Sequence, residues 1–95
     1  MKTFKILVSE TAQKALAELD IKISAKIKSS LRELSSDPFR SRSGADIKKL
    51  HGCREPAMYR LRIGDFRVIY FIDENNVKVT DVISREKGYD WLVSV

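Results

Sequence analysis

Three arginines flank a Gly64-Asp65 pair in a segment where apolar and basic residues alternate: Arg60, Arg62 and Arg67. A two-residue turn at Gly64-Asp65 would pair Arg62 with Arg67 across a hairpin and leave Arg60 on the same face. Guanidinium groups bind phosphate in a bidentate manner, so the pattern predicts an anion-binding sheet face. Two alternatives remain: neutralisation by nearby carboxylates, or arginines that only keep the sheet soluble.

The opposite face of the same hairpin is apolar. It would carry Tyr59, Leu61, Ile63, Phe66, Val68 and Tyr70. A continuous apolar face of this kind is expected to pack on helices. We therefore expect both tyrosines in the core, although an exposed tyrosine could stack on a nucleobase.

The positive charge is concentrated in the middle of the chain. Residues 40–67 hold eight basic and three acidic side chains, a net +5 that equals the charge of the whole protein. A local basic excess is typical of surfaces that bind nucleic acid, an acidic protein or a membrane, or it is simply a solvated surface. Lys48, Lys49 and Arg54 are candidate RNA-phosphate contacts. His51, the only histidine, lies beside them and is a weaker RNA-binding candidate, since lone histidines are often structural.

Several classes of protein and site are disfavoured. Clusters of His, Cys and carboxylates at metal-ligand spacing are absent, so we expect no metal and no cofactor. Cys53 is the single cysteine, which excludes an internal disulfide and is simplest in a reducing cytoplasm. No apolar run approaches the ~20 residues of a membrane-spanning helix, so we expect no membrane association. The 95 residues predict a single domain, residues 1–95.

The periodicity of apolar residues predicts the elements that position these side chains. Two helices are expected at about 10–20 and 23–34, with Ser9 or Thr11 as the first N-cap and Asp37-Pro38 as the end of the second. Strands are expected at 2–9, from Ile47, and at 58–63, 66–72 and 77–84, followed by a short helix or tail. This order predicts an α+β fold: an N-terminal strand and a two-helix hairpin packed on a mainly antiparallel four-stranded sheet.

One residue conflicts with strict alternation in the last strand. Val77, Val79, Asp81 and Ile83 would all face the core, and a buried Asp81 carboxylate would be unfavourable. Either a basic or hydroxyl group pairs with Asp81, or a β-bulge shifts the register.

Three segments together resemble the RelE/ParE toxin superfamily of bacterial and archaeal toxin–antitoxin systems. They are Lys48–Gly52 (KKLHG), Tyr59–Tyr70 (YRLRIGDFRVIY), and Val79–Arg85 with Tyr89. The resemblance covers nearly the whole chain and includes the order of the elements. It implies a growth-inhibiting toxin that a cognate antitoxin neutralises. The RelE branch cleaves messenger RNA in the ribosomal A site, whereas the ParE branch poisons DNA gyrase and has lost the basic cleft residues.

The resemblance also implies site residues. The RelE-type cleft positions fall on Arg60, Arg62, Arg67, Arg85 and Tyr89. Of these, Arg62, Arg67, Arg85 and Tyr89 are the expected catalytic residues, and Arg60 is expected to bind RNA. The two strand positions are arginine here, where well-studied relatives have lysine and one lysine is a proposed proton acceptor. Ser84 stands where many relatives have histidine, so the identity of a general base is open.

The resulting expectation is a ribosome-dependent, metal-free mRNA endonuclease that inhibits translation in the cytoplasm. Its expected partners are the ribosome, mRNA and an acidic, partly disordered antitoxin, with operator DNA bound only through that antitoxin. The alternatives are a ParE-like toxin that acts on gyrase and a degenerate member that binds antitoxin without activity.

Overall fold

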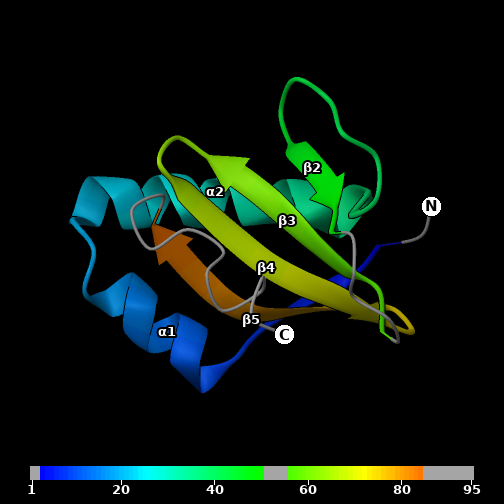
Figure 1. Cartoon of the computed structure of the whole chain (residues 1–95), viewed down its shortest axis with the longest axis horizontal. Helices are drawn as coiled ribbons and strands as arrows, with labels where there is room; N and C mark the ends of the chain where they lie inside the picture. Colours follow the sequence, from blue (N-terminus) through cyan, green and yellow to red (C-terminus); the bar gives the residue numbers. More distant parts are fainter. Residues whose placement is uncertain (1–2, 51–55, 85–95) are drawn as a thin grey trace.

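The computed structural model describes residues 3–50 and 56–84, which form one five-stranded sheet with both helices on one face (Figure 1). The elements in chain order are β1 (Lys5–Val8), α1 (Glu10–Ala17), α2 (Ile21–Ser36), β2 (Asp46–Lys49), β3 (Met58–Ile63), β4 (Phe66–Asp73) and β5 (Asn76–Ser84). The strand order is β1-β5-β4-β3-β2. Strand β1 runs parallel to β5, and the other pairs are antiparallel.

This architecture confirms the predicted α+β class and corrects one detail. The N-terminal strand joins the main sheet as an edge strand, so the sheet has five strands instead of four. The expected C-terminal helix or tail, residues 85–95, lies outside the described residues. In the part of the chain that the structure describes, no helix is long and apolar enough to cross a membrane.

Side-chain caps define where the helices begin. The Ser9 hydroxyl accepts a hydrogen bond from the Ala12 amide at 3.1 Å and donates one to the Thr80 carbonyl at 2.8 Å. Ser9, and not Thr11, is therefore the N-cap of α1, and it also ties the helix to β5. Asp20 caps α2 by accepting from the Lys22 amide at 2.8 Å. Arg42 donates to the Glu33 carbonyl at 2.7 Å, which satisfies a carbonyl near the end of α2.

The core lies between the helices and the sheet. Its buried side chains include Leu16, Ile27, Leu31, Leu34, Leu61, Val68, Val77 and Val79. Tyr70 is fully buried, stacks on Tyr59 with ring centroids 5.7 Å apart, and donates its hydroxyl to the Pro38 carbonyl at 2.7 Å. Burial raises the pKa of the Tyr70 hydroxyl. Both tyrosines thus pack as predicted, whereas Ile23, predicted on the buried stripe of the second helix, is 36% exposed.

The β3–β4 hairpin has the predicted register. Ile63 pairs with Phe66 and Arg62 with Arg67, so the connection is the two residues Gly64 and Asp65. Gly64 has a φ of +57°, and Asp65 is not in the positive-φ region. A positive φ at the first central residue only is the pattern of a type II′ turn, for which glycine is the preferred residue.

A β-bulge in β5 resolves the conflict at Asp81. Ile69 pairs with Asp81 and Tyr70 with Val79, so Thr80 is the extra residue. Before the bulge Val77 and Val79 face the core, and after it Val82 does. Asp81 and Ile83 therefore lie on the sheet face away from the helices.

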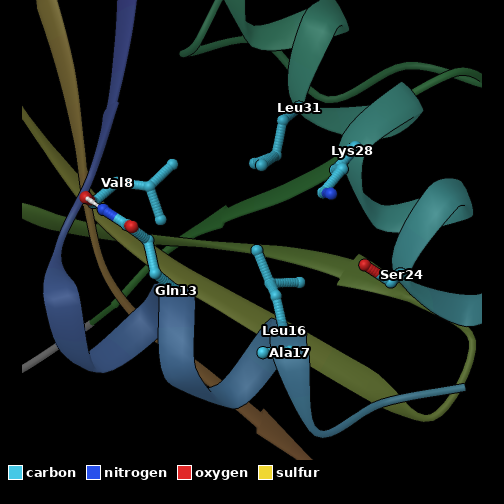
Figure 2. A pocket seen from close by; sticks show the side chains of 7 residues that line it. All are labelled: Val8, Gln13, Leu16, Ala17, Ser24, Lys28 and Leu31. Carbon is cyan, nitrogen blue, oxygen red and sulfur yellow. Dashed lines mark hydrogen bonds between the residues drawn. The ribbon is translucent and has the colours of Figure 1, made fainter. Parts of the chain in front are cut away.

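A groove of about 420 Å³ separates α1 and α2 above the sheet (Figure 2). It is lined by Val8, Gln13, Leu16, Ala17, Ser24, Lys28 and Leu31. Figure 2 shows Leu16 rising from α1 and Leu31 descending from α2, so the groove is largely apolar with Lys28 contributing its one charged side chain.

Candidate anion-binding face of the sheet

The three hairpin arginines lie on the sheet face that the helices leave open. Their register partners form two rows across the strands: Asp46, Arg62, Arg67 and Ile83, then Lys48, Arg60, Ile69 and Asp81. Paired residues project from the same side of a sheet, so each row shares one face. We call the set Arg60, Arg62, Arg67 and Lys48 the arginine face.

The three guanidinium groups differ in what holds them. The Arg60 Nη1 lies 3.5 Å from the Asp46 Oδ1, and the Arg60 side chain is only 15% exposed. The Arg67 Nη1 lies 3.4 Å from the Phe66 carbonyl oxygen and 3.5 Å from that of Gly64, at the limit of hydrogen bonding. Arg62 is exposed, and no partner for its side chain occurs among residues 3–50 and 56–84.

This arrangement favours binding of an anion between the two central arginines. Directly opposed like charges on a sheet are mutually destabilising. A phosphate placed between Arg62 and Arg67 would relieve that repulsion and accept hydrogen bonds from both. Arg62, which has no partner among the described residues, thus lies opposite Arg67, which is held only by weak carbonyl contacts.

The structure brings together four of the predicted site residues. Lys48 pairs with Arg60 and so lies on the arginine face, beside Arg62 and Arg67. Lys49 pairs with Tyr59 and therefore projects from the other face, at the edge of the helical layer. The remaining predicted residues, His51, Arg54, Arg85 and Tyr89, lie outside the described residues.

Two carboxylates lie beside the arginines, and neither was among the predicted site residues, although neutralisation by nearby carboxylates was an open alternative. Asp46 stands opposite Arg62 in β2 and contacts Arg60. The bulge places Asp81 at the β5 end of the row that contains Arg60. The conflict of Asp81 with strict alternation was a signal in the sequence, whereas Asp46 had no such signal, because the register of β2 follows a long loop.

These groups define the chemistry that the face can support. Guanidinium groups stabilise negative charge that develops on phosphoryl oxygens, and they remain protonated at any working pH. Asp46 and Asp81 add one carboxyl group to each of the two rows. Within the described ranges, no group of three or more His, Cys, Asp or Glu side chains is placed to hold a metal ion.

Comparison with known proteins gives both a family and structural relatives. Residues 6–89 match the family model described as the ParE toxin of type II toxin–antitoxin systems, parDE. No curated protein matches the sequence. Among solved structures, the archaeal RelE–RelB complex from Pyrococcus horikoshii OT3 is 26% identical, with a TM-score of 0.76 over 90% of this chain and 99% of that chain.

Two further solved structures agree with this relationship. The RelB–RelE antitoxin–toxin complex from Methanococcus jannaschii is 25% identical, with a TM-score of 0.71 over 90% of this chain and 96% of that chain. The RelBE2 toxin–antitoxin complex from Mycobacterium tuberculosis is 28% identical, with a TM-score of 0.71 over 87% of this chain and 99% of that chain. The family match spans most of the sequence, and the fold is that of RelE toxins. The chain therefore belongs to the ParE toxin family of type II toxin–antitoxin systems, within the RelE/ParE toxin superfamily.

Proposed function

We propose that this toxin is a ribosome-dependent, metal-free endoribonuclease that cleaves mRNA and so inhibits translation in the cytoplasm. The observation that carries the proposal is the position of Arg62, exposed and without a partner among the described side chains, directly opposite Arg67. A face that only needed to stay soluble would not require two opposed arginines there, since threonine suits a strand better.

The proposed reaction uses the RNA's own 2′-hydroxyl as nucleophile. Its oxygen attacks the adjacent phosphorus, a P–O2′ bond forms, the P–O5′ bond breaks, and the leaving O5′ takes up a proton. Negative charge gathers on the non-bridging oxygens, where Arg62 and Arg67 would donate hydrogen bonds. Each well-placed donor of this kind can lower a barrier by about 2.7–4 kcal/mol. Arg60 and Lys48 would hold neighbouring phosphates, which positions RNA without reading its sequence.

The proton from the 2′-hydroxyl needs an acceptor other than arginine. Asp46 is already in contact with Arg60. Asp81 lies in the same row as Arg60 and has no ion-pair partner within the described part of the chain. We therefore take Asp81 as the acceptor to test first, beside Tyr89 and Arg85, whose catalytic roles rest on the family resemblance.

The proposed regulatory partner is an acidic antitoxin. The P. horikoshii, M. jannaschii and M. tuberculosis relatives are all complexes of a toxin with its antitoxin. The chain's net charge of +5 favours an acidic partner. Binding of operator DNA would then be a property of the antitoxin.

A second candidate function is a ParE-like toxin that acts on DNA gyrase. The match to the ParE family model favours it. The arginine face argues against it, because the resemblance implies that the gyrase-directed branch lacks the basic cleft residues. A degenerate toxin that binds antitoxin without activity is the third candidate.

Transcript-end mapping after induced expression separates these candidates. The wild-type protein is compared with Arg62→Ala/Arg67→Ala and with Lys14→Ala/Arg40→Ala, which removes two cations with side chains 76% and 79% exposed. We expect new in-frame 5′ ends with the wild type and the control pair, and none with the arginine pair. Unchanged toxicity of the arginine variant would refute the nuclease. Altered plasmid supercoiling without new transcript ends would indicate gyrase as the target, and no effect of the wild type would indicate a degenerate member.

A further inference from the structure

A third row of side chains crosses the open sheet face, beyond the two rows that hold the arginines. Phe71 in β4 pairs with Met58 on one side and with Lys78 on the other, and Lys78 pairs with Leu7 of the edge strand β1. Phe71 lies four positions after Arg67 on the same strand, so its row shares the face of the arginines. Leu7 is 41% exposed and Phe71 is half-buried, and neither belongs to the core between the helices and the sheet. We call Leu7, Lys78, Phe71 and Met58 the Phe71 row.

A hollow of about 240 Å³ opens along this row, where β1, β5 and β4 lie side by side (Figure 1). It is lined by Leu7, Val8, Ser9, Phe71, Lys78, Val79 and Thr80. A water molecule occupies roughly 30 Å³ in the liquid, so the hollow holds far more than a water. Pockets for drug-sized ligands are larger, at about 300–1,000 Å³. The hollow therefore suits one flat ring system of a larger ligand.

The side chains around the hollow offer an aromatic surface with polar groups at its rim. The Lys78 Nζ lies over the Phe71 ring, 5.9 Å from its centroid, so a face of the ring is turned toward the hollow. The same ammonium lies 2.9 Å from the Asp73 Oδ2, which uses one of its three donors. The Thr80 hydroxyl donates to the Ile69 carbonyl at 3.3 Å, and its oxygen can still accept a hydrogen bond. Proteins recognise single-stranded nucleobases through this combination of an aromatic face with donors and acceptors.

The hollow is within reach of an RNA strand that the arginine face holds. Residues two apart on a strand are about 7 Å apart, so Phe71 lies about 14 Å from Arg67 along β4. Ile69, between them, is fully buried and offers no surface to a ligand. Arg60 and Lys48 lie in the intermediate row, where the proposed function places a neighbouring phosphate. Phosphates bound along the two arginine rows would therefore bring a base of the same strand to the Phe71 row.

We propose that the hollow along the Phe71 row is a base subsite, in which a nucleobase of the bound RNA stacks on Phe71. This inference rests on the proposed function and concerns the part of the substrate that the arginines do not contact. Phosphate contacts position a nucleic acid without carrying sequence information, whereas a stacked base is also contacted at its edge. The Phe71 row therefore adds affinity that depends on the presence of a base, next to the affinity that the arginine face supplies through phosphate.

The test measures binding of the full chain to two short labelled probes at several salt concentrations. One probe is 2′-O-methyl oligoadenylate, which lacks the nucleophilic hydroxyl and so is not cleaved. The other has the same length and phosphates, with every base replaced by an abasic spacer. The ratio of the two affinities measures the contribution of the bases.

The variants separate the aromatic ring of Phe71 from its apolar character. Phe71→Leu removes the ring and keeps an apolar side chain, whereas Phe71→Tyr keeps the ring. Leu7→Thr, at the exposed rim of the hollow, is a second test variant that leaves the ring in place. The matched control is Phe39→Leu, because Phe39 is 48% exposed and packs against Tyr59, away from the hollow. Thermal unfolding and antitoxin binding of each protein are recorded to confirm the folded state.

We expect the wild type and Phe71→Tyr to bind oligoadenylate at least about fivefold more tightly than the abasic probe, because stacking on an aromatic ring contributes that factor or more. Phe71→Leu should bring the ratio close to unity and Leu7→Thr should lower it, whereas Phe39→Leu should keep it. The salt dependence of Phe71→Leu should match that of the wild type, since no phosphate contact is lost.

Three results would overturn the base subsite. The first is equal affinity of the wild type for both probes. The second is a base contribution that persists in Phe71→Leu, or that Phe39→Leu removes to the same extent. The third is loss of antitoxin binding in Phe71→Leu with the base contribution intact, which would assign the Phe71 row to the antitoxin.

This outcome is separable from the test of the proposed function. Probe binding is measured without cleavage, and transcript ends report cleavage through the arginine face. A toxin that yields new transcript ends but binds both probes equally would refute the base subsite alone. A toxin that yields no new transcript ends would refute the nuclease, and a base contribution that Phe71→Leu removes would then still support the subsite as a site of RNA binding.

Discussion

Arg62 and Arg67 face each other directly across the β3–β4 hairpin, on the sheet surface that the helices leave open. The two-residue turn fixes this pairing, because a slip of either strand by one residue would move the arginine of that strand to the apolar face. Like charges at opposed positions lower the stability of the hairpin. The pair is therefore better explained by an external anion than by folding.

The first prediction concerns this repulsion. Arg62→Thr should raise the free energy of unfolding by about 0.2–1 kcal/mol, because it removes the like-charge pair and introduces a good strand former. The same variant should lose RNA cleavage. Urea unfolding measures the first effect and transcript-end mapping the second. A loss of stability above about 1 kcal/mol would show that Arg62 has a structural role that the described contacts do not reveal.

The second prediction concerns the contact between Asp46 and Arg60. Asp46 is 55% exposed, so Asp46→Asn should change the free energy of unfolding by less than about 1 kcal/mol. It should strengthen binding of single-stranded RNA, because Arg60 loses its ion-pair partner and its charge becomes available to RNA, and because the face loses a negative charge. Titration of a labelled oligonucleotide at two salt concentrations measures this. Weaker binding would indicate that Asp46 orients Arg60 for RNA instead of competing with it.

The third prediction tests the bulge at Thr80. Because Val82 and not Asp81 faces the core, Val82→Asp should destabilise the fold by more than about 2 kcal/mol, whereas Asp81→Asn should leave stability within about 0.5 kcal/mol. If Asp81 accepts the proton, Asp81→Asn should also slow cleavage on ribosomes without weakening ribosome binding. Stability effects in the reverse order would contradict the observed register.

The bulge marks the limit of what the sequence could predict. The hairpin was predictable because Gly64 permits the positive φ of a short turn and both flanking strands alternate strictly. The sequence showed that Asp81 broke the pattern, but a bulge and a buried ion pair both remained possible. A tertiary contact accompanies the bulge: the Ser9 hydroxyl, at the start of α1, donates a hydrogen bond to the carbonyl of Thr80, the extra residue of the bulge. No local sequence pattern reports such a contact.

Long-range pairing set the other limit. The N-terminal strand was predicted, but its parallel pairing with β5 was not. This pairing joins residues 71 positions apart, such as Lys5 and Asn76, and no local signal in the sequence reports such contacts. The same holds for Asp46, whose place beside the arginines depends on the register of β2 against β3. Residue types near a turn were thus predictable, and residues brought in from a distant strand were not.

The fourth prediction concerns pH. Hydrogen bonds from the Phe39 and Arg40 amides lower the pKa of the Asp37 carboxyl below its usual 3.8, with Arg42 and Arg40 as further causes. A carboxyl with a lowered pKa in the folded state stabilises the fold above pH 3.8, and this contribution disappears as the pH falls through the folded-state pKa. Asp37→Asn should therefore flatten the stability profile below about pH 4. An unchanged acid profile in urea unfolding would contradict this.

The last prediction concerns strain in the β4–β5 turn. Glu74 has a φ of +57°, a left-handed conformation that raises the energy of a residue with a β-carbon by about 1–2 kcal/mol. Glycine adopts this conformation freely but loses about 0.5–1 kcal/mol more through its greater freedom when unfolded. Glu74→Gly should therefore stabilise the protein by roughly 0.5–1 kcal/mol, which raises the Tm by about 2–8 °C in a domain of this size. The matched control is Asn75→Gly, at the neighbouring turn position that lacks a positive φ. That variant should be neutral or destabilising, and stabilisation of equal size in both would show that the gain does not come from relief of backbone strain at Glu74.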